Sequence, residues 1–307
     1  MADDLMTTNG QIQWGTLLLG ERSPYAGRVA AGWTSRPQVD SGSVLRAQQH
    51  GGYPGRLLAR ERVITFDFEL IPEDPSLDSL WPSYLEALEA AVAIEQAERP
   101  LVVQLAGRRL QVDARVTDFV MPDDRQFTRG NPRGTIEWTC SDPRRYGMTA
   151  LSFPTGLPQS GSGLDWGDTS SPTGLDWHDG DSPAGLDWGT GGSSGDLAVT
   201  NAGTAPTHPL LEIRGPVVMP SIVLQETGQV LEYDLPLAAS DVLTVDTAAG
   251  TVTLASGASR LYTVTARSSP EEAFVLPPGT STLSFRAAPG SSDPAASLTV
   301  RYRPAYW

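Results

Sequence analysis

Apolar and polar positions alternate most clearly over residues 60–71. Four apolar residues occupy every second position there: Ile64, Phe66, Phe68 and Leu70. A period of two is typical of a β-strand with one buried face. Similar patterns predict three further segments of β structure: a strand over 12–19, a hairpin that joins 101–105 to 108–116, and a strand over 134–140. The first half of the chain is therefore predicted to be mainly antiparallel β-sheet.

One segment of the first half has the period of a helix. Its apolar residues fall on one stripe: Trp81, Tyr84, Leu85, Leu88, Ala91 and Val92. Pro82 stands where the first turn of a helix tolerates proline. We expect a helix over 81–95 that packs against the sheet. Residues 35–59 contain several glycines and are expected to form a loop or a protruding hairpin.

The pattern changes between residues 153 and 195, where Gly, Ser, Pro and Asp predominate. The tetrad Gly-Leu-Asp-Trp occurs three times there, ending at Trp166, Trp177 and Trp188. Too little apolar surface lies between the repeats for a core, which predicts a connector between two domains. The three tryptophans are the candidate contact residues of the chain. They could fasten the connector to the nearest sheet, stack on sugar rings, or insert into a partner subunit.

Short apolar runs recur through residues 196–307 and are separated by turn residues. They lie at 210–214, 222–225, 230–235, 242–245, 251–254, 261–264, 274–276, 283–286 and 298–302. If most of these runs are strands, the spacing predicts a β-sandwich of roughly seven to nine strands. The expected division is a first domain over 1–152, a connector over 153–195 and a second domain over 196–307.

The charge of the chain argues against several classes of partner. It contains 22 arginines and no lysine against 36 Asp and Glu residues, for a net charge of -14. Binding to nucleic acid or to an anionic membrane depends on clustered cations, so neither is expected as a partner. Cys140 is the only cysteine, which excludes an intramolecular disulfide, and we expect it to be buried.

No pattern in the sequence points to catalysis. Residues 191–195 match G-x-S-x-G, but a nucleophile elbow needs a strand before the serine and a helix after it, and this match lies in the polar connector. The histidines are scattered without metal-ligand spacing: His50, His178 and His208. Acidic residues around His178 could gather a calcium ion, although a solvated turn explains them better. We expect no catalytic residue, no metal and no cofactor.

Several motifs, in their order along the chain, resemble those of the siphophage distal tail proteins, the siphovirus-type tail component family. In the first half they are Gly20-x-x-Ser23-Pro24-Tyr25, His50-Gly51, the helix over 81–95, and a strand that ends in Asp142-Pro143. In the second half they are Asn201-x-Gly203-Thr204-x-Pro206, Ile213-x-Gly215-Pro216, Val245-Asp246, Pro278-Gly279 before Leu283-x-Phe285, and Tyr302-Arg303-Pro304.

The resemblance implies a mainly β protein with a ring-forming, antiparallel β-barrel-like N-terminal domain with one helix and a galectin-like C-terminal β-sandwich. It implies a structural protein and not an enzyme, present in the virion as part of a phage tail that assembles in the host cytoplasm. Six copies would form a ring that joins the tail tube protein to the tail tip or hub protein. The tryptophans leave open an alternative, a carbohydrate-binding or receptor-binding tail module.

Overall fold

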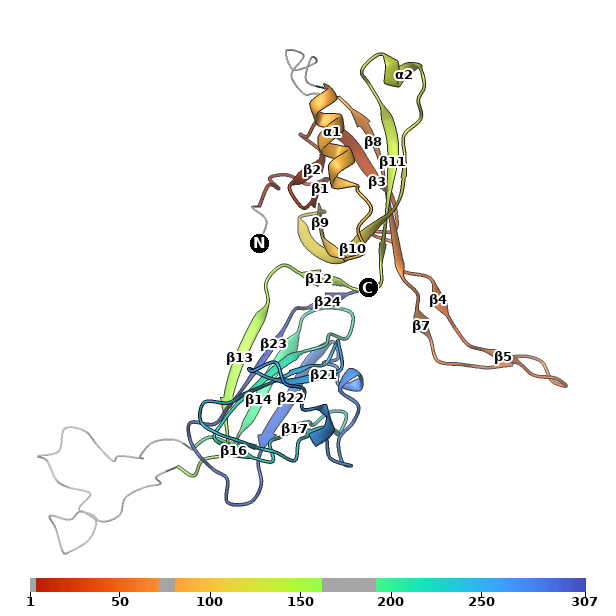
Figure 1. The fold of residues 1–307 in the computed structure, drawn as a ribbon. Helices are drawn as coiled ribbons and strands as arrows, with labels where there is room; N and C mark the ends of the chain where they lie inside the picture. The colour runs from red at the N-terminus through yellow and green to blue at the C-terminus, as the bar shows by residue number, and fades with distance from the viewer. Residues whose placement is uncertain (1–3, 72–80, 162–191) are drawn as a thin grey trace, which may run out of the picture. The chain divides into compact units, whose positions relative to one another are not determined.

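The computed structural model describes residues 4–71, 81–161 and 192–307 (Figure 1). The chain divides into two compact units. The first unit contains residues 1–149 and the last three residues, 305–307, and the second contains residues 150–304. Both are built mainly from antiparallel strands, which confirms the predicted fold class.

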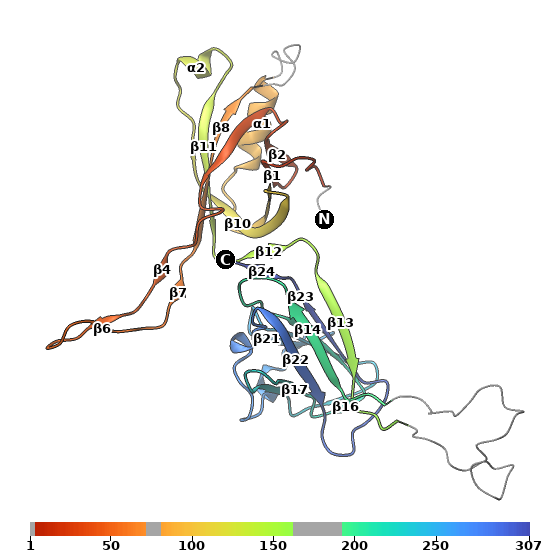
Figure 2. The same cartoon turned by 180° about the vertical axis from the view of Figure 1, so that it is seen from behind.

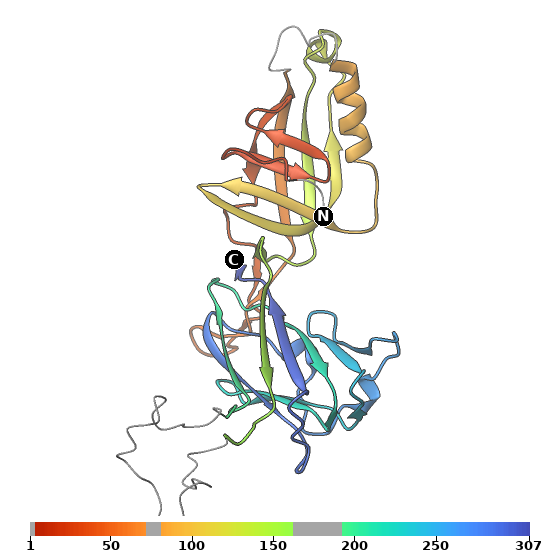
Figure 3. The ribbon, with the colours of Figure 1, turned by 90° about the vertical axis from the view of Figure 1, so that its left-hand side faces the viewer.

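The sheet of the first unit curls into a nearly closed barrel (Figure 3). Its strands follow the spatial order β2-β1-β9-β10-β11-β8-β3. Their bounds are β1 Gln11–Trp14, β2 Leu17–Gly20, β3 Tyr25–Ala31, β8 Arg62–Leu70, β9 Arg99–Leu105, β10 Arg108–Val120 and β11 Arg133–Cys140. The strands at the two ends of the order, β2 and β3, follow each other in sequence and lie in contact. Near closure leaves few free edges in the sheet.

The long strand β10 lets one sheet bend into a barrel. Its first half pairs with β9 and its second half with β11. Between the two, the register shifts by one residue at Thr117, between Val116 and Asp118. Such a bulge bends a strand and increases its twist. The predicted hairpin of β9 and β10 is confirmed, and Ala106 and Gly107 form its turn with φ values of 52° and 72°.

Helix α1, Trp81–Ala91, packs along one side of the barrel (Figure 3). Leu88 is fully buried and joins the barrel core. The helix is four residues shorter than the predicted 81–95, and Ile94, three residues beyond its end, is 94% exposed. A short helix α2, Arg125–Thr128, lies in the turn between β10 and β11 and is capped by the Asp124 carboxylate.

The single strand predicted over 12–19 is two strands. β1 and β2 pair with each other across a two-residue turn, Gly15-Thr16. Gly15 has a φ of 60°, a conformation that glycine adopts without strain. The apolar positions on both sides of the turn made the segment look continuous, and Ile12 and Leu19 are both fully buried.

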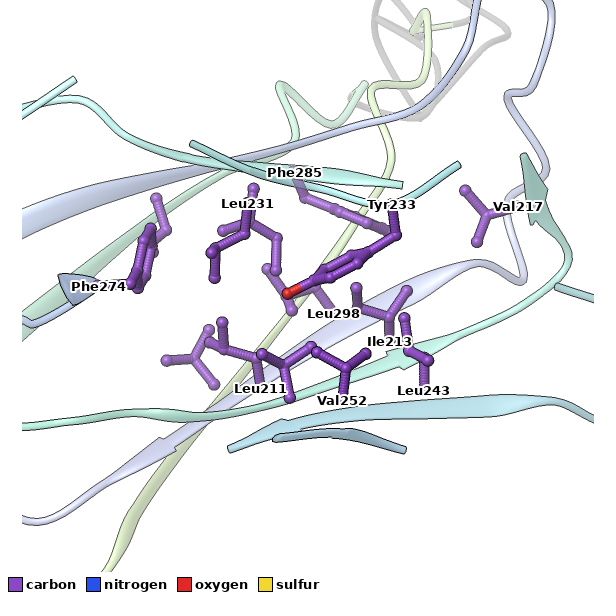
Figure 4. Packing of buried hydrophobic residues seen from close by; sticks show 14 of the residues in the cluster. Leu211, Ile213, Val217, Leu231, Tyr233, Leu243, Val252, Phe274, Phe285 and Leu298 are labelled. Carbon is purple, nitrogen blue, oxygen red and sulfur yellow. The ribbon is translucent and has the colours of Figure 1, made fainter. Parts of the chain in front are cut away.

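The second unit is a two-layer β-sandwich. One sheet has the order β13-β23-β15-β20-β21 and the other β14-β22-β17-β18. Their bounds are β13 Leu151–Gly156, β14 Asp196–Asn201, β15 Leu210–Arg214, β17 Ser221–Leu224, β18 Gln229–Glu232, β20 Val242–Asp246, β21 Thr251–Leu254, β22 Gly279–Arg286 and β23 Ser297–Tyr302. A small ladder pairs β16, Val217–Val218, with β19, Pro236–Leu237. The fully buried side chains meet between the layers (Figure 4).

Two runs predicted as strands in the second unit form other structures. Leu261–Thr263 is a 3-10 helix, η2. The run at 274–276 follows a second 3-10 helix, η3 Glu271–Ala273, and contributes one isolated bridge between Leu276 and Thr207. Phe274 and Leu276 are nevertheless fully buried. The apolar pattern therefore identified core residues correctly without identifying their backbone conformation.

The division into units differs from the predicted boundaries. Strand β13 begins the second unit, because it pairs with β23 over its whole length. Phe153, which marked the expected start of the connector, stacks on Tyr302 with ring centroids 6.1 Å apart. After the segment that follows β13, the chain returns as β14 in the other sheet of the same sandwich. The polar segment is therefore an insertion within the second unit and does not connect the two units.

The described ends of this insertion are held together. The backbone N–H of Gln159 donates to the carbonyl of Ser193 at 2.9 Å, and the N–H of Ser193 donates to the carbonyl of Gln159 at 3.1 Å. The insertion thus leaves and rejoins the sandwich at one place. Its three tryptophans, Trp166, Trp177 and Trp188, lie outside the described residues.

Candidate assembly surface

The first unit carries a projecting hairpin between β3 and β8, here called the arm, residues 39–59 (Figures 1 and 2). It consists of two short ladders. β4, Val39–Asp40, pairs with β7, Leu58–Ala59, and β5, Val44–Leu45, pairs with β6, Gly52–Tyr53. The structure thus confirms the protruding hairpin expected over 35–59. Because the arm is only two strands wide, both of its outer edges are unpaired within the described part of the chain.

The arm presents large apolar side chains to solvent. Those that are at least two-fifths exposed are Val39, Val44, Leu45, Tyr53, Leu57 and Leu58. Leu45 is 86% exposed and Leu57 is 69% exposed. An isolated two-stranded hairpin is marginally stable in water, and clustered exposed apolar residues mark interaction surfaces. The arm therefore has the properties of a segment that is covered by another protein.

Local contacts hold the arm as a hairpin. The Arg46 guanidinium lies over the Tyr53 ring, 4.9 Å from its centroid. The backbone N–H of Arg46 donates to the carbonyl of Gly51 at 3.2 Å and closes the turn, and Gly51 has a φ of 93°. These contacts shape the tip without burying its apolar side chains.

The last residues of the chain complete a sheet of the first unit. β24, Ala305–Tyr306, pairs with β12, Arg145–Gly147, which in turn pairs with β10. The Arg108 guanidinium lies 4.5 Å from the centroid of the Tyr306 ring. Arg145 donates hydrogen bonds to the carbonyls of Trp33 and Trp307. The chain thus crosses twice between the units, once at 149–150 and again at 304–305.

Titratable side chains near the start of β12 are buried or hydrogen-bonded to one another: Cys140, Asp142, Arg144 and Tyr146. Cys140 is fully buried, and burial raises the pKa of its thiol to about 12, so the nucleophilic thiolate is not formed near neutral pH. Burial alone would raise the pKa of Asp142, but hydrogen bonds from Arg144 and Tyr146 hold it below its usual value. The Arg144 Nε and Nη2 atoms donate to the two Asp142 oxygens at 2.8 and 2.9 Å.

The residues considered for catalysis and metal binding are not brought together. Ser193 forms an isolated β-bridge with Gln159 and is followed by strand β14. A nucleophile elbow requires a helix after the serine, so Ser193 is not in such an elbow. His50 is exposed at the arm, His208 contacts the Thr247 carbonyl, and His178 lies outside the described residues. Within residues 4–71, 81–161 and 192–307, no three His, Cys, Asp or Glu side chains form a metal-binding group. No helix in the same ranges is long and apolar enough to cross a membrane.

The sandwich and the residues that follow it match a known family. The model described as siphovirus-type tail component, C-terminal domain, matches residues 202–306. The match covers 105 of the 307 residues, almost all of them in the second unit. The match confirms the resemblance inferred from the motifs of the second half. All residues of these motifs except Asn201 lie within the matched range. No match is found among curated proteins.

The fold over most of the chain is similar to that of a solved phage protein. The crystal structure of the SPP1 Dit (gp 19.1) protein, described as a paradigm of hub adsorption apparatus in phages that infect Gram-positive bacteria, is similar with a TM-score of 0.56 and 13% identity over 90% of this chain and 92% of that chain. Two structures of the phage P2 baseplate in its activated conformation also match. The structure with Ca has a TM-score of 0.48 and 11% identity, over 95% of this chain and 97% of that chain. The structure with Sr has a TM-score of 0.47 and 12% identity, over 95% of this chain and 96% of that chain. The SPP1 similarity shows that the order of both units is a known architecture.

Sequence reasoning located the arm but missed its apolar surface. The signal was present, because Val44-Leu45 and Leu57-Leu58 are pairs of adjacent apolar residues. In an extended strand neighbouring side chains point to opposite faces, so a thin hairpin cannot bury both members of a pair on one core. The proposed role of the three tryptophans as contact residues stays a prediction, as does the glycan-binding alternative that depends on them.

Proposed function

We propose that this protein is a non-catalytic structural component of a phage tail, a distal tail protein whose copies form a ring. The family of residues 202–306 and the similarity of fold to SPP1 Dit support this proposal. The ring would contain six copies, as the family resemblance implies, and would join the tail tube protein to the tail tip or hub protein. The protein would reside in the virion after assembly in the host cytoplasm.

The observation that carries the proposal is the exposed apolar arm. In a monomer, its six large apolar side chains would remain in water. In a closed ring, the arm of each copy reaches the next copy, and the same contact repeats until the ring closes. Burial of each such side chain contributes about 1.5–3 kcal/mol before the cost of ordering is subtracted.

The charge of the chain is consistent with a ring through which DNA passes without binding to the protein. Residues 1–150 contain 16 Arg and 20 Asp or Glu, and the chain as a whole has a net charge of -14. A phosphate backbone is held by cations that are not already paired with acids. We therefore expect no measurable affinity of the ring for duplex DNA at physiological salt.

A pair of arm substitutions tests the ring. Leu45→Ser with Leu57→Ser removes two exposed apolar side chains of the arm. Ile94→Ser is the matched control, because Ile94 is 94% exposed and lies outside the arm. Sedimentation should show that the wild type and Ile94→Ser form a defined oligomer at micromolar concentration, while the double variant dissociates. Equal assembly of the double variant and the wild type would exclude the arm as the contact.

A further inference from the structure

A pocket lies where the arm leaves the barrel. It has a volume of about 290 Å³ and is formed where residues 32–38, which lead into β4, meet residues 60–63, which lead from β7 into β8. We call it the root pocket. The residues that matter for its chemistry are Ser35, Arg36, Arg60, Glu61 and Arg62. Three of these five are arginines, in a protein with 36 acidic residues and only 22 basic ones.

Arg62 is a buried cation that is incompletely satisfied. Its side chain lies on the inward face of β8, with the same parity as Ile64 and Phe66, and the residue is 1% exposed. Its Nε donates to the carbonyl of Pro143 at 2.7 Å, and its Nη1 donates to the carbonyls of Gly32 at 2.6 Å and Ser35 at 2.8 Å. Nη2 is buried and has no hydrogen-bond partner in the described part of the chain.

No carboxylate among the described residues forms an ion pair with Arg62. Asp142 is held by Arg144 and Tyr146, and Glu61, which lines the root pocket, is exposed. Arg145 adds a second positive charge, because both it and Arg62 donate to the Trp33 carbonyl. Burial, and next the charge of Arg145, lower the pKa of Arg62 to about 10. A buried charge without a counterion is costly.

The rim of the root pocket is also cationic. Arg36 is exposed, and Arg60 meets Asp40 at 3.5 Å with both side chains about 60% exposed. Such an exposed pair contributes little and leaves Arg60 able to take another partner. Arg36, Arg60 and Arg62 thus all line one small cavity. Guanidinium groups bind carboxylates with strong, oriented hydrogen bonds.

We propose that the root pocket holds the carboxylate of an Asp or Glu side chain from a second copy of this chain. The proposal rests on the proposed ring, because a neighbour that covers the apolar arm also brings its side chains to the base of the arm. The composition favours this source. With no lysine in the chain, arginine is the only side chain other than histidine that can neutralise the 36 acidic residues when copies meet.

Self-association measured by sedimentation over a concentration series tests the proposal. Arg36→Gln with Arg60→Gln removes both rim charges and leaves the buried Arg62 in place. Arg125→Gln with Arg129→Gln is the control, because it makes the same change of charge at two exposed arginines of the β10–β11 turn. The rim variant should raise the dissociation constant about tenfold or more, and the control should change it by less than about threefold. Equal weakening by both variants, or by neither, would overturn the proposal.

Free anions identify the chemistry of the site. Replacing chloride by acetate at constant ionic strength should weaken association of the wild type, because acetate competes for the root pocket, and should leave the rim variant unaffected. Inorganic phosphate that competes better than acetate would overturn the assignment of a carboxylate. If the wild type is monomeric throughout the concentration series, the proposed ring is wrong, and a second copy cannot be the source of the carboxylate. An acetate-dependent rise in the unfolding temperature that the rim variant lacks would then still establish a carboxylate site.

Discussion

The indole Nε1 of Trp14 donates a hydrogen bond to the carbonyl of Ala91 at 2.8 Å, which joins the first strand of the barrel to the last residue of α1. Trp138 packs beside Trp14 with ring centroids 6.0 Å apart, but its own Nε1 is buried without a partner in the described part of the chain. The two neighbouring tryptophans therefore differ in one hydrogen bond within one core.

This difference predicts unequal effects of the same substitution. Trp14→Phe and Trp138→Phe each remove similar volume from the barrel core, but only Trp14→Phe removes a hydrogen bond. The loss of that bond should destabilise the fold by about 1 kcal/mol more than Trp138→Phe does. Urea unfolding of both variants measures the difference. An equal or larger loss for Trp138→Phe would contradict the prediction.

Tyr25 predicts how stability changes at alkaline pH. Its hydroxyl donates to the Tyr84 carbonyl at 2.7 Å, and burial, with a smaller effect of Tyr84, raises its pKa to about 12 from the ordinary value of 10.0. A raised pKa in the folded state gives stability that is present below pH 10 and lost as the pH rises toward 12. Tyr25→Phe should therefore flatten the fall in unfolding free energy between pH 10 and 12. The control is Tyr53→Phe, because Tyr53 is 62% exposed on the arm; the same flattening in both variants would contradict the assignment to Tyr25.

The insertion predicts an unusual result of proteolysis. A single cut between residues 162 and 191 separates β13 from β14, and both strands belong to the second unit. β13 makes a six-residue ladder with β23, so the two fragments should stay associated under native conditions and separate only in denaturant. Gel filtration before and after denaturation shows this. Release of a free fragment from the native protein would instead support an inter-domain connector.

The sequence predicted the elements whose signals are local. Period-two alternation identified β8 and β11, and helical periodicity identified α1. It failed where long-range pairing decides the structure. Phe153 stands at the edge of a Gly- and Ser-rich region, and only the pairing of its strand β13 with the distant strand β23 shows that it belongs to a sheet. The 3-10 helix at Leu261–Thr263 has an apolar run like those of the strands, and its conformation depends on neighbours that are remote in sequence.

The candidate site was predicted only in part. The arm was expected as a hairpin, but its apolar surface and the root pocket were not. Arg62 continues the alternation of Ile64 and Phe66, so the period alone places an arginine on the inward face of β8. What the sequence does not contain is the convergence of the Gly32, Ser35 and Pro143 carbonyls on that guanidinium, because these residues are brought together only by folding.

The most direct test of the account is negative-stain electron microscopy of the purified protein, combined with a native mass measurement. The account predicts closed rings of uniform diameter and a mass that is a whole multiple of the 32.8 kDa chain, with six copies as the expected number. Single particles of 32.8 kDa at micromolar concentration, or open filaments with no closed ring, would contradict it.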